Sequence, residues 1–275
     1  MHDMLDAGWC QPDSSFALDS ACASGIMHVT VMHWDYIIIL IILAVALPWR
    51  STARIRELLR LPDLSGVARL RLYSSTIIFQ WILSAAIFWR LSAHGMTALQ
   101  IGLAVPYPGR AVAITAVLSA LLIVNQIFGM RRLAGLPSER RGLIGAMAER
   151  LLPRSGAEAL VAMLLLGTVA LCEEFIYRGF VETIFQTAMR SAVLGAVISA
   201  AFFAAAHLYQ GRRGVVTTFA IGLIFSAGRI WSASLLPSMV IHFVVDFSAG
   251  IAASRMLSRR SALSIFAICF TRRSW

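Results

Sequence analysis

The chain is divided into long apolar runs that are separated by short polar segments. Because a helix that crosses a bilayer needs about 20 mostly apolar residues, the runs predict about seven transmembrane helices. They cover residues 36–48, 72–89, 111–129, 159–180, 192–207, 215–231 and 237–253. The first run reaches spanning length only with His33 and Trp34, and a last apolar stretch at 261–270 is too short to span. The pattern predicts an all-α fold, that of a polytopic helical membrane protein.

The composition supports a membrane protein and excludes several function classes. The chain is 59% hydrophobic and 14% charged, with a mean hydropathy of +0.76, whereas soluble domains carry about 25% charged residues. All 24 basic residues are arginine, which excludes a P-loop lysine, a Schiff-base lysine and a Ser–Lys protease dyad. The net charge of +10 is spread between the apolar runs. We therefore expect the lipid bilayer, and no nucleic acid, as a partner.

The arginines predict the orientation in the membrane. Three connections carry few of them, namely Arg90 and Arg110, then Arg190, then Arg229. The segments after the first, third, fifth and seventh spans are richer, with Arg50, Arg54, Arg56, Arg60, Arg69 and Arg71, then Arg131, Arg132, Arg140, Arg141, Arg150 and Arg154, then Arg212 and Arg213, then Arg255, Arg259 and Arg260. Since cytoplasmic loops carry the excess of positive charge, the Arg-rich side is expected to be cytoplasmic. We expect an integral protein of the bacterial cytoplasmic (inner) membrane.

The start of the chain differs from the rest. Residues 1–31 hold four aspartates, no arginine and no long apolar run, whereas a signal peptide has a basic start and an apolar middle. Two interpretations stay open: the segment is a disordered extension, or translation starts at Met32, directly ahead of the first span.

Ionisable residues inside the predicted spans are the candidates for chemistry, because each costs about 2.5–3.5 kcal/mol in hydrocarbon. They form three clusters on three spans, with the members Glu173, Glu174 and Arg178, then His207 beside Phe203, then His242 and Asp246. Glu174 and Arg178 are four residues apart and share a helix face, whereas Glu173 is rotated by about 100° from Glu174. One carboxylate is thus expected to be neutralised by Arg178, and the other is free to act.

The other two clusters also follow helical spacing. Phe203 and His207 are four residues apart, as are His242 and Asp246, so each pair shares a face. Each cluster alone is also explained by helix packing or by an interfacial histidine. Together, in a chain so poor in charge, they favour one shared polar site. A carboxylate can activate water, and imidazoles can stabilise an oxyanion or hold a metal, a combination that suits hydrolysis of an amide.

The three clusters resemble the motifs of the CPBP family of intramembrane proteases, also called CAAX proteases and bacteriocin-processing enzymes, or the Abi family. The family pattern is EExxxR, then FxxxH, then HxxxN or HxxxD, on successive membrane helices. The matching residues here are Glu173, Glu174 and Arg178, then Phe203 and His207, then His242 and Asp246. The resemblance covers about residues 159–253, and the Arg178–Gly179 step is also similar to the family. The first three spans add only hydropathy.

The resemblance implies roles for these residues. Glu173 would be the general base, Glu174 and Arg178 would position it, and His207 would assist the base or bind the water. His242 with Asp246 would stabilise the tetrahedral oxyanion. Because an ionised Asp would repel an oxyanion, Asp246 is either protonated or only orients His242.

Metal dependence stays open in the sequence. Two histidines and a glutamate are a known zinc ligand set, and a bound Zn²⁺ would be held by Glu173, His207 and His242. However, no H-E-x-x-H signature is present, and neither is the G-x-S-x-G of serine hydrolases. The favoured interpretation requires no cofactor, with Zn²⁺ as the alternative.

Simple alternation of the spans places His207 near the inner end of one span and His242 near the outer end of another. At about 1.5 Å per residue, the intervening span separates them by most of the bilayer. For the two histidines to meet, that span must be tilted, or broken at Gly222 or Gly228, or the loop at 211–214 must re-enter. Irregular backbone at depth is tolerated only around a protein-lined cavity.

The sequence thus predicts an intramembrane endopeptidase of the CAAX-protease-like type, with a glutamate-activated water and a peptide or protein substrate, prenylated or otherwise membrane-anchored. The alternative is a non-enzymatic membrane protein, a proton-coupled transporter or a bacteriocin-immunity scaffold, that uses the same polar cluster. The expected division is a disordered extension at 1–31, transmembrane helices with Arg-rich loops at 32–156, the CPBP-like catalytic region at 157–255 and a C-terminal tail at 256–275.

Overall fold

The computed structural model describes residues 32–61, 63–135 and 142–271, and within these ranges every regular element is a helix. The elements are α2 (Trp34–Ile41), η1 (Ile42–Ala46), α3 (Leu47–Arg60), α4 (Gly66–Ala93), α5 (Pro108–Ala134), α6 (Gly142–Leu151), α7 (Gly156–Glu174), η3 (Phe175–Glu182), α8 (Thr183–Met189), α9 (Ala192–Ala206), η4 (Leu208–Gln210), α10 (Gly211–Ser232) and α11 (Leu236–Thr271). The all-α prediction is confirmed. The predicted extension at 1–31 lies outside the described residues.

Six helical segments of the described chain are long and apolar enough to cross a membrane, namely Trp34–Arg60, Gly66–Ala93, Pro108–Arg132, Gly156–Met189, Leu208–Ser232 and Leu236–Ser254. The remaining predicted span, the fifth at 192–207, is α9, an apolar helix that is too short to meet the same length criterion. The first span includes Trp34 and runs without interruption through η1 into α3. The polytopic helical prediction is confirmed, with one short helix among its members.

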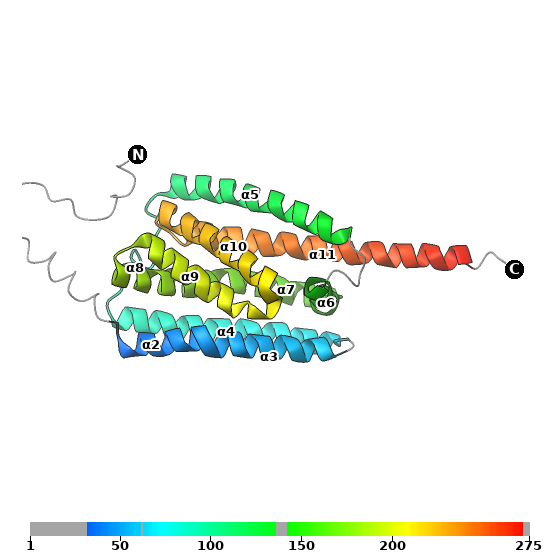
Figure 1. The fold of residues 1–275 in the computed structure, drawn as a ribbon, viewed down its shortest axis with the longest axis horizontal. Helices are drawn as coiled ribbons and strands as arrows, with labels where there is room; N and C mark the ends of the chain where they lie inside the picture. The colour runs from blue at the N-terminus through cyan, green and yellow to red at the C-terminus, as the bar shows by residue number, and fades with distance from the viewer. Residues whose placement is uncertain (1–31, 62, 136–141, 272–275) are drawn as a thin grey trace, which may run out of the picture.

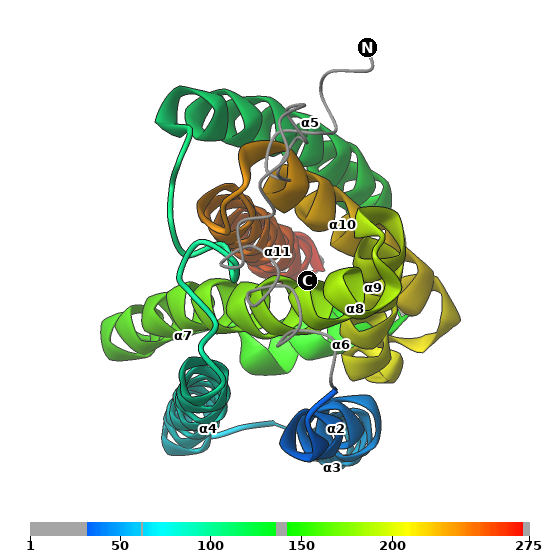
Figure 2. The same ribbon diagram turned by 90° about the vertical axis from the view of Figure 1, so that its left-hand side faces the viewer.

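The helices form one elongated bundle. In Figure 1 the connections α3–α4, α5–α6 and α9–α10 lie toward one end, and the connections α4–α5, α8–α9 and α10–α11 lie at the other. We call the first the arginine end, because the sequence around the α3–α4 and α5–α6 connections is rich in arginine. Figure 2 looks along the bundle and places α11 between α5, α10 and α7, with α2, α3 and α4 on the far side of α7.

Local sequence explains where several helices begin and end. Ser65, Ser155 and Ser191 precede α4, α7 and α9, and each side-chain oxygen accepts a hydrogen bond from a backbone N–H of the first turn. α8 and α10 end at Arg190 and Ala233, whose φ angles of 49° and 54° are left-handed. Those two residues let the chain reverse within a few positions, so α9 and α11 begin directly after the turns.

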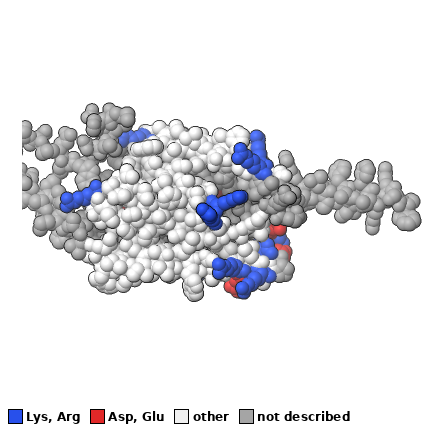
Figure 3. All heavy atoms as spheres, viewed as in Figure 1, with Lys and Arg blue, Asp and Glu red and all other residues white. Residues whose placement is uncertain are grey.

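The surface fits a lipid environment. Large apolar side chains are exposed along the spans, among them Val45, Ile82, Val112, Leu164 and Val193. The face drawn in Figure 3 is uncharged over most of its length, and its basic side chains lie toward the two ends, with more of them toward the arginine end. This distribution is that of a protein whose middle faces hydrocarbon and whose ends face headgroups and water.

Two arginines that the sequence assigned to loops are instead buried between helices. Arg69 belongs to α4, and its Nε lies 2.8 Å from Oε2 of Glu158 at the start of α7. Arg229 belongs to α10 and pairs with Glu182 of η3 at 3.1 Å. Since an unpaired charge in the membrane is costly, each arginine lies where a glutamate of another helix can meet it.

Candidate active site

Glu174 is the centre of a buried ionic cluster. Its side chain is fully buried, and its Oε1 accepts hydrogen bonds from Nη1 of Arg178 at 3.0 Å and from Nδ1 of His242 at 2.9 Å. Arg178 is also fully buried and donates from Nη2 to the carbonyl oxygen of Gly222 at 3.1 Å. As the four-residue spacing predicts, the second glutamate of the motif is neutralised by the arginine.

The packing around Arg178 fixes the guanidinium in place. Its Cζ lies 4.4 Å from the ring centroid of Phe203 and 5.3 Å from that of Phe225. Gly222 lets α10 approach, because a Cβ there would lie 3.1 Å from Nη2 of Arg178 and 3.2 Å from Cα of Ala200. The segment that carries Arg178 is a π-helix, Phe175–Glu182, a wide-turned form that is frequent at functional sites.

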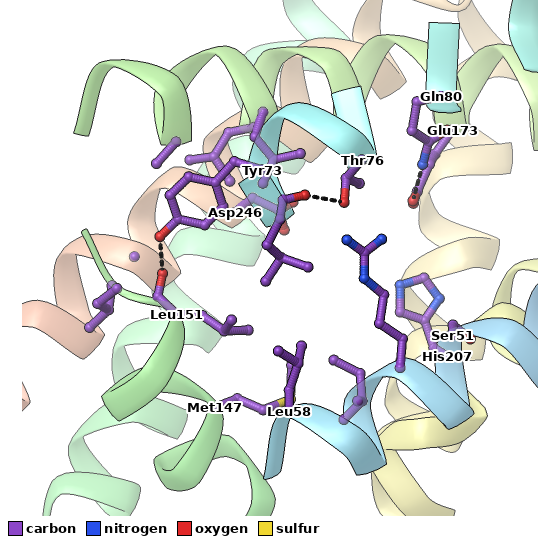
Figure 4. Close-up of a pocket in the computed structure, with 18 of the residues that line it drawn as sticks. Ser51, Leu58, Tyr73, Thr76, Gln80, Met147, Leu151, Glu173, His207 and Asp246 are labelled. Atoms are coloured by element: carbon purple, nitrogen blue, oxygen red, sulfur yellow. Dashed lines mark hydrogen bonds between the residues drawn. The ribbon is translucent and has the colours of Figure 1, made fainter. Parts of the chain in front are cut away.

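Glu173 faces a different direction from Glu174. Its Oε1 accepts a hydrogen bond from Nε2 of Gln80 at 3.0 Å, and its Oε2 is buried without a hydrogen-bond partner in the described part of the chain. Figure 4 shows Gln80, from α4, reaching Glu173 at the edge of a cavity. Glu173 therefore has one oxygen held in place and one buried oxygen without a hydrogen-bond partner among the described residues.

The cavity has a volume of about 620 Å³, and Glu173, His207 and Asp246 line it together. Most of its lining is apolar, from α3, α4, α6, α7 and α11, and it reaches Leu58, Met147 and Leu151 toward the arginine end (Figure 4). Tyr73 helps to hold its wall by donating a hydrogen bond to the carbonyl oxygen of Leu151. An apolar cavity with a few convergent polar groups is the usual form of a small ligand or substrate site.

His207 follows the last residue of α9 and presents one ring nitrogen to this cavity. Its Nδ1 lies 2.8 Å from the carbonyl oxygen of Phe203. Because a carbonyl oxygen only accepts, Nδ1 carries the proton, and a neutral His207 keeps a lone pair on Nε2. The carbonyl of Ala206 accepts a hydrogen bond from Ser51 of α3 at 3.1 Å, which fixes the end of α9.

His242 and Asp246 lie one turn apart on α11, as their spacing predicts. Nε2 of His242 is 3.5 Å from Oδ2 of Asp246, and its Nδ1 faces Glu174. Asp246 lines the cavity, whereas His242 is buried behind it and is not part of the lining. His242 thus connects the buried cluster of Glu174 to a carboxylate on the cavity wall.

The two histidines pack against the same ring, that of Phe203, without a broken helix. The ring of Phe203 lies 4.8 Å from that of His207 and 5.9 Å from that of His242. Residues 211–232, with Gly222 and Gly228 among them, form the continuous helix α10, so neither a break nor a re-entrant loop is present. Figure 1 shows α9 and α10 crossing the bundle obliquely, and α9 is short. Tilt and a short helix bring all six predicted residues together.

Several residues of the site carry no motif signal. Gln80 interrupts the apolar run at 72–89, and this polar residue inside a span was the available signal for it. Tyr177 and Tyr209 also line the cavity, and the Tyr209 ring lies 5.7 Å from that of His207. Arg50 and Arg54, which the sequence assigned to topology, line the same cavity from α3.

A zinc ion at the predicted ligands would require Glu173, His207 and His242 to approach one another. The tautomer of His207 and the contact of His242 with Glu174 are those of metal-binding histidines, whose second nitrogen is held by a carbonyl or a carboxylate. However, in the described part of the chain the one group of three such side chains with ligand atoms within 4.8 Å of one another is His33, Asp35 and His94. Glu173, His207 and His242 do not converge on one point, so they do not fit a metal ion as placed.

Comparison with known proteins agrees with the motifs. Residues 155–248 match the model of a protein family described as type II CAAX prenyl endopeptidase Rce1-like. Over this region the chain is similar to the Rce1-like CAAX protease family. The match contains every predicted site residue from Glu173 to Asp246, which confirms the family that the three motifs indicated. No curated protein and no solved structure matches the chain.

Part of the site lies outside the region that matches the family. It includes α7 to η4, α10 and the first part of α11, but Gln80, Ser51 and the cavity wall of α3 and α4 lie outside it. Helices outside the matched region thus form part of the cavity wall, and the matched region carries the polar cluster.

Proposed function

We propose that the protein is a membrane endopeptidase in which Glu173 activates a water molecule for attack on a peptide bond in the cavity. One observation carries the proposal: Glu173 lines the cavity, whereas its neighbour Glu174 is fully buried, is paired with Arg178 and is not part of the lining. The two adjacent carboxylates are thereby given different roles. The family match supports a membrane endopeptidase, and the water activation is our inference from the geometry.

The proposed reaction needs one proton acceptor and one held water. Glu173 takes a proton from water, the oxygen attacks the carbonyl carbon of the substrate, and the proton passes to the leaving nitrogen as the C–N bond breaks. His207 stands beside this water with the lone pair of Nε2 turned toward the cavity and orients it. Gln80 holds Oε1 of Glu173 and leaves Oε2 to act.

Glu174, Arg178 and His242 are positioning residues in this proposal. Glu174 fixes His242, and His242 holds Asp246 on the cavity wall. The role that the resemblance gives to His242, stabilisation of the oxyanion with Asp246, stays a prediction; as placed, His242 is behind the wall and acts through its neighbours. A protonated Asp246 can itself donate to an oxyanion, whereas an ionised one cannot.

The cavity also supports a substrate class. Its apolar walls suit a membrane-anchored peptide, and a prenyl group is the substituent that the family description names. We propose a peptide or protein substrate that enters from the arginine end, where Arg50 and Arg54 line the cavity. If that end is cytoplasmic, as the arginines predict, cleavage occurs on the inner side of the bacterial cytoplasmic membrane.

Cleavage of fluorogenic reporter peptides by the purified chain in detergent tests the proposal. We expect turnover by the wild type and a loss of at least about 100-fold in Glu173→Gln, the usual contribution of a general base. His207→Ala should also lose turnover. Glu57→Gln, which changes an exposed glutamate of α3 in the same chemical way, is the matched control and should keep activity.

Three other results would contradict parts of the proposal. Equal cleavage by wild type and Glu173→Gln would falsify the assignment of the base. No cleavage by folded wild type, with or without prenylated peptides, favours the non-enzymatic alternatives, a proton-coupled transporter or an immunity scaffold. Loss of activity in chelator that added Zn²⁺ restores, in a variant without His33 and His94, replaces the cofactor-free mechanism with a metal-dependent one.

A further inference from the structure

A second polar cluster lies at the end of the bundle opposite the arginine end. It is formed by His33 and Asp35 at the start of α2 and by His94, the residue that ends α4. The ligand atoms of these three side chains lie within 4.8 Å of one another. The family match begins at residue 155, so the cluster lies outside it. We propose that His33, Asp35 and His94 form a binding site for a divalent transition-metal ion such as Zn²⁺.

Among the described residues, Asp35 has one carboxylate oxygen that is held by neighbours and one that is unpaired. Its side chain is 9% exposed, and its Oδ1 is buried without a hydrogen-bond partner in the described part of the chain. Its other oxygen, Oδ2, is already held by Nε of Arg90 at 2.5 Å and lies 3.0 Å from Nε2 of His94. A carboxylate with one oxygen fixed by a hydrogen bond and the other free is the form in which carboxylates bind metals.

The imidazoles of His33 and His94 are not satisfied by hydrogen bonds within the described chain. Nε2 of His94 lies 3.0 Å from Oδ2 of Asp35, which requires a proton on Nε2, and 3.3 Å from Nη2 of Arg90, which requires a lone pair there. One nitrogen cannot meet both requirements. His33 makes no side-chain hydrogen bond to any described residue, and its ring stacks on that of His94 at 3.7 Å. Two histidines and one carboxylate are the zinc set that leaves a fourth position for water.

The site can rearrange and is reached from water. His33 precedes α2 in an extended backbone conformation, so its ring can turn away from the stack without moving the helix. The side chain of His94 is 19% exposed. Arg90, 28% exposed, stays on Oδ2 as a hydrogen-bond donor to the ligating carboxylate, and its charge keeps the affinity below that of a closed zinc site.

A bound ion would join α2 to α4 at the end of the bundle away from the cavity. Tyr36 packs there too, 5.0 Å from the His94 ring and 5.4 Å from Phe180 of η3. Through Tyr36 the ion would also stabilise the contact with the helix that carries the catalytic cluster. We therefore expect a higher thermal unfolding midpoint with Zn²⁺ and no requirement for Zn²⁺ in the chemical step.

The experiment separates this site from the cavity. The background is the full chain with His207→Ala and His242→Ala, which removes the histidines of the cavity site. In this background, calorimetric titration with ZnCl₂ should give one bound ion per chain and a raised midpoint of thermal unfolding. Adding His94→Ala or the milder His33→Ala should weaken binding by at least about tenfold and remove the thermal shift. His28→Ala, five residues from His33, is the matched control and should change neither.

Two results would overturn the proposal. One is Zn²⁺ binding that survives His33→Ala and His94→Ala but disappears with His28→Ala. The other is binding to the wild type that is lost with His207→Ala and His242→Ala, which would place the ion at the cavity. Because the readouts are stoichiometry and thermal shift rather than turnover, failure here leaves the proposed peptidase activity untouched.

Discussion

Glu174 and Glu182, at the two ends of η3, each form a buried pair with an arginine, and the two pairs are nearly identical in distance. Glu174 lies 3.0 Å from Arg178, Glu182 lies 3.1 Å from Arg229, and both glutamates are fully buried. Their surroundings differ. Glu174 also binds His242, which leads to Asp246 on the cavity. Arg229 instead contacts Thr183, Gln186 and the carbonyl oxygen of Gln100, and no member of that set lines the cavity.

A buried charge pair inside a membrane protein is therefore not by itself a functional signal. Both pairs satisfy charges that would be costly in hydrocarbon. What distinguishes the first pair is a chain of contacts to a cavity. The first pair is expected to affect stability and turnover together, and the second to affect stability alone.

Removal of each arginine gives the largest expected effects. Arg229→Ala leaves Glu182 buried and unpaired, so we expect a loss of about 3–5 kcal/mol in unfolding free energy. Arg178→Ala should cost a similar amount and also reduce turnover per folded molecule by at least about tenfold. Thermal or denaturant unfolding in detergent gives the first quantity, and reporter cleavage normalised to folded protein gives the second.

If the folded fraction of Arg229→Ala loses turnover as Arg178→Ala does, the expected difference between the two pairs is contradicted. Arg229→Ala with Glu182→Gln is the internal control, because replacing both charges removes the unpaired carboxylate and should restore part of the stability.

The close approach of α10 gives the next effect in size. A Cβ at Gly222 would meet Nη2 of Arg178 and Cβ of Ala200 at 3.1 Å each. We expect Gly222→Ala to cost about 1–3 kcal/mol of stability by overpacking, with reduced turnover because Arg178 is displaced. Gly167→Ala, in α7 with nothing within 4 Å of the added atom, is the matched control and should be neutral or stabilising by up to about 1 kcal/mol.

The hydrogen bond between Gln80 and Glu173 gives a smaller effect that is confined to activity. Gln80→Leu keeps the size of the side chain and removes the donor to Oε1 of Glu173. Loss of one such bond is worth about 1 kcal/mol, which corresponds to about a fivefold change in rate. We expect kcat to fall by about this factor with the stability nearly unchanged. Unchanged kcat would show that Glu173 is positioned by other groups.

Local spacing predicted part of the site, because two of its contacts lie within single helices. Glu174 with Arg178 and His242 with Asp246 are neighbours one turn apart, and both pairs meet as expected. Gln80, Ser51 and the wall of α3 come from helices far away in the sequence, and one sequence carries no information on which distant helices touch. The hydropathy pattern likewise identified the spans but could not show that α9 is short and oblique.

The same limit explains the misplaced arginines. Arg69 and Arg229 lie at the ends of apolar runs, so sequence assigned them to loops. The glutamates that pair with them, Glu158 and Glu182, are 89 and 47 residues away along the chain. Helix α6 was missed for a related reason, since a short helix within an Arg-rich connection has no spanning hydropathy.

The smallest expected effect concerns the exposed pair of Asp63 and Arg154 at the arginine end. Their charged atoms are 2.7 Å apart, and the hydrogen bonds from Arg154 lower the pKa of the Asp63 carboxyl below its usual value. A lowered pKa adds stability above the unfolded-state pKa of Asp63, and that stability is lost as the pH falls through the folded value. Because the pair is solvated, the change should be close to the detection limit. Thermal midpoints of wild type and Asp63→Asn between neutral and acidic pH measure it. A large difference between the midpoints of wild type and Asp63→Asn would show that this solvated pair stabilises the fold as the buried pairs do. In that case burial would not explain which charge pairs matter for stability.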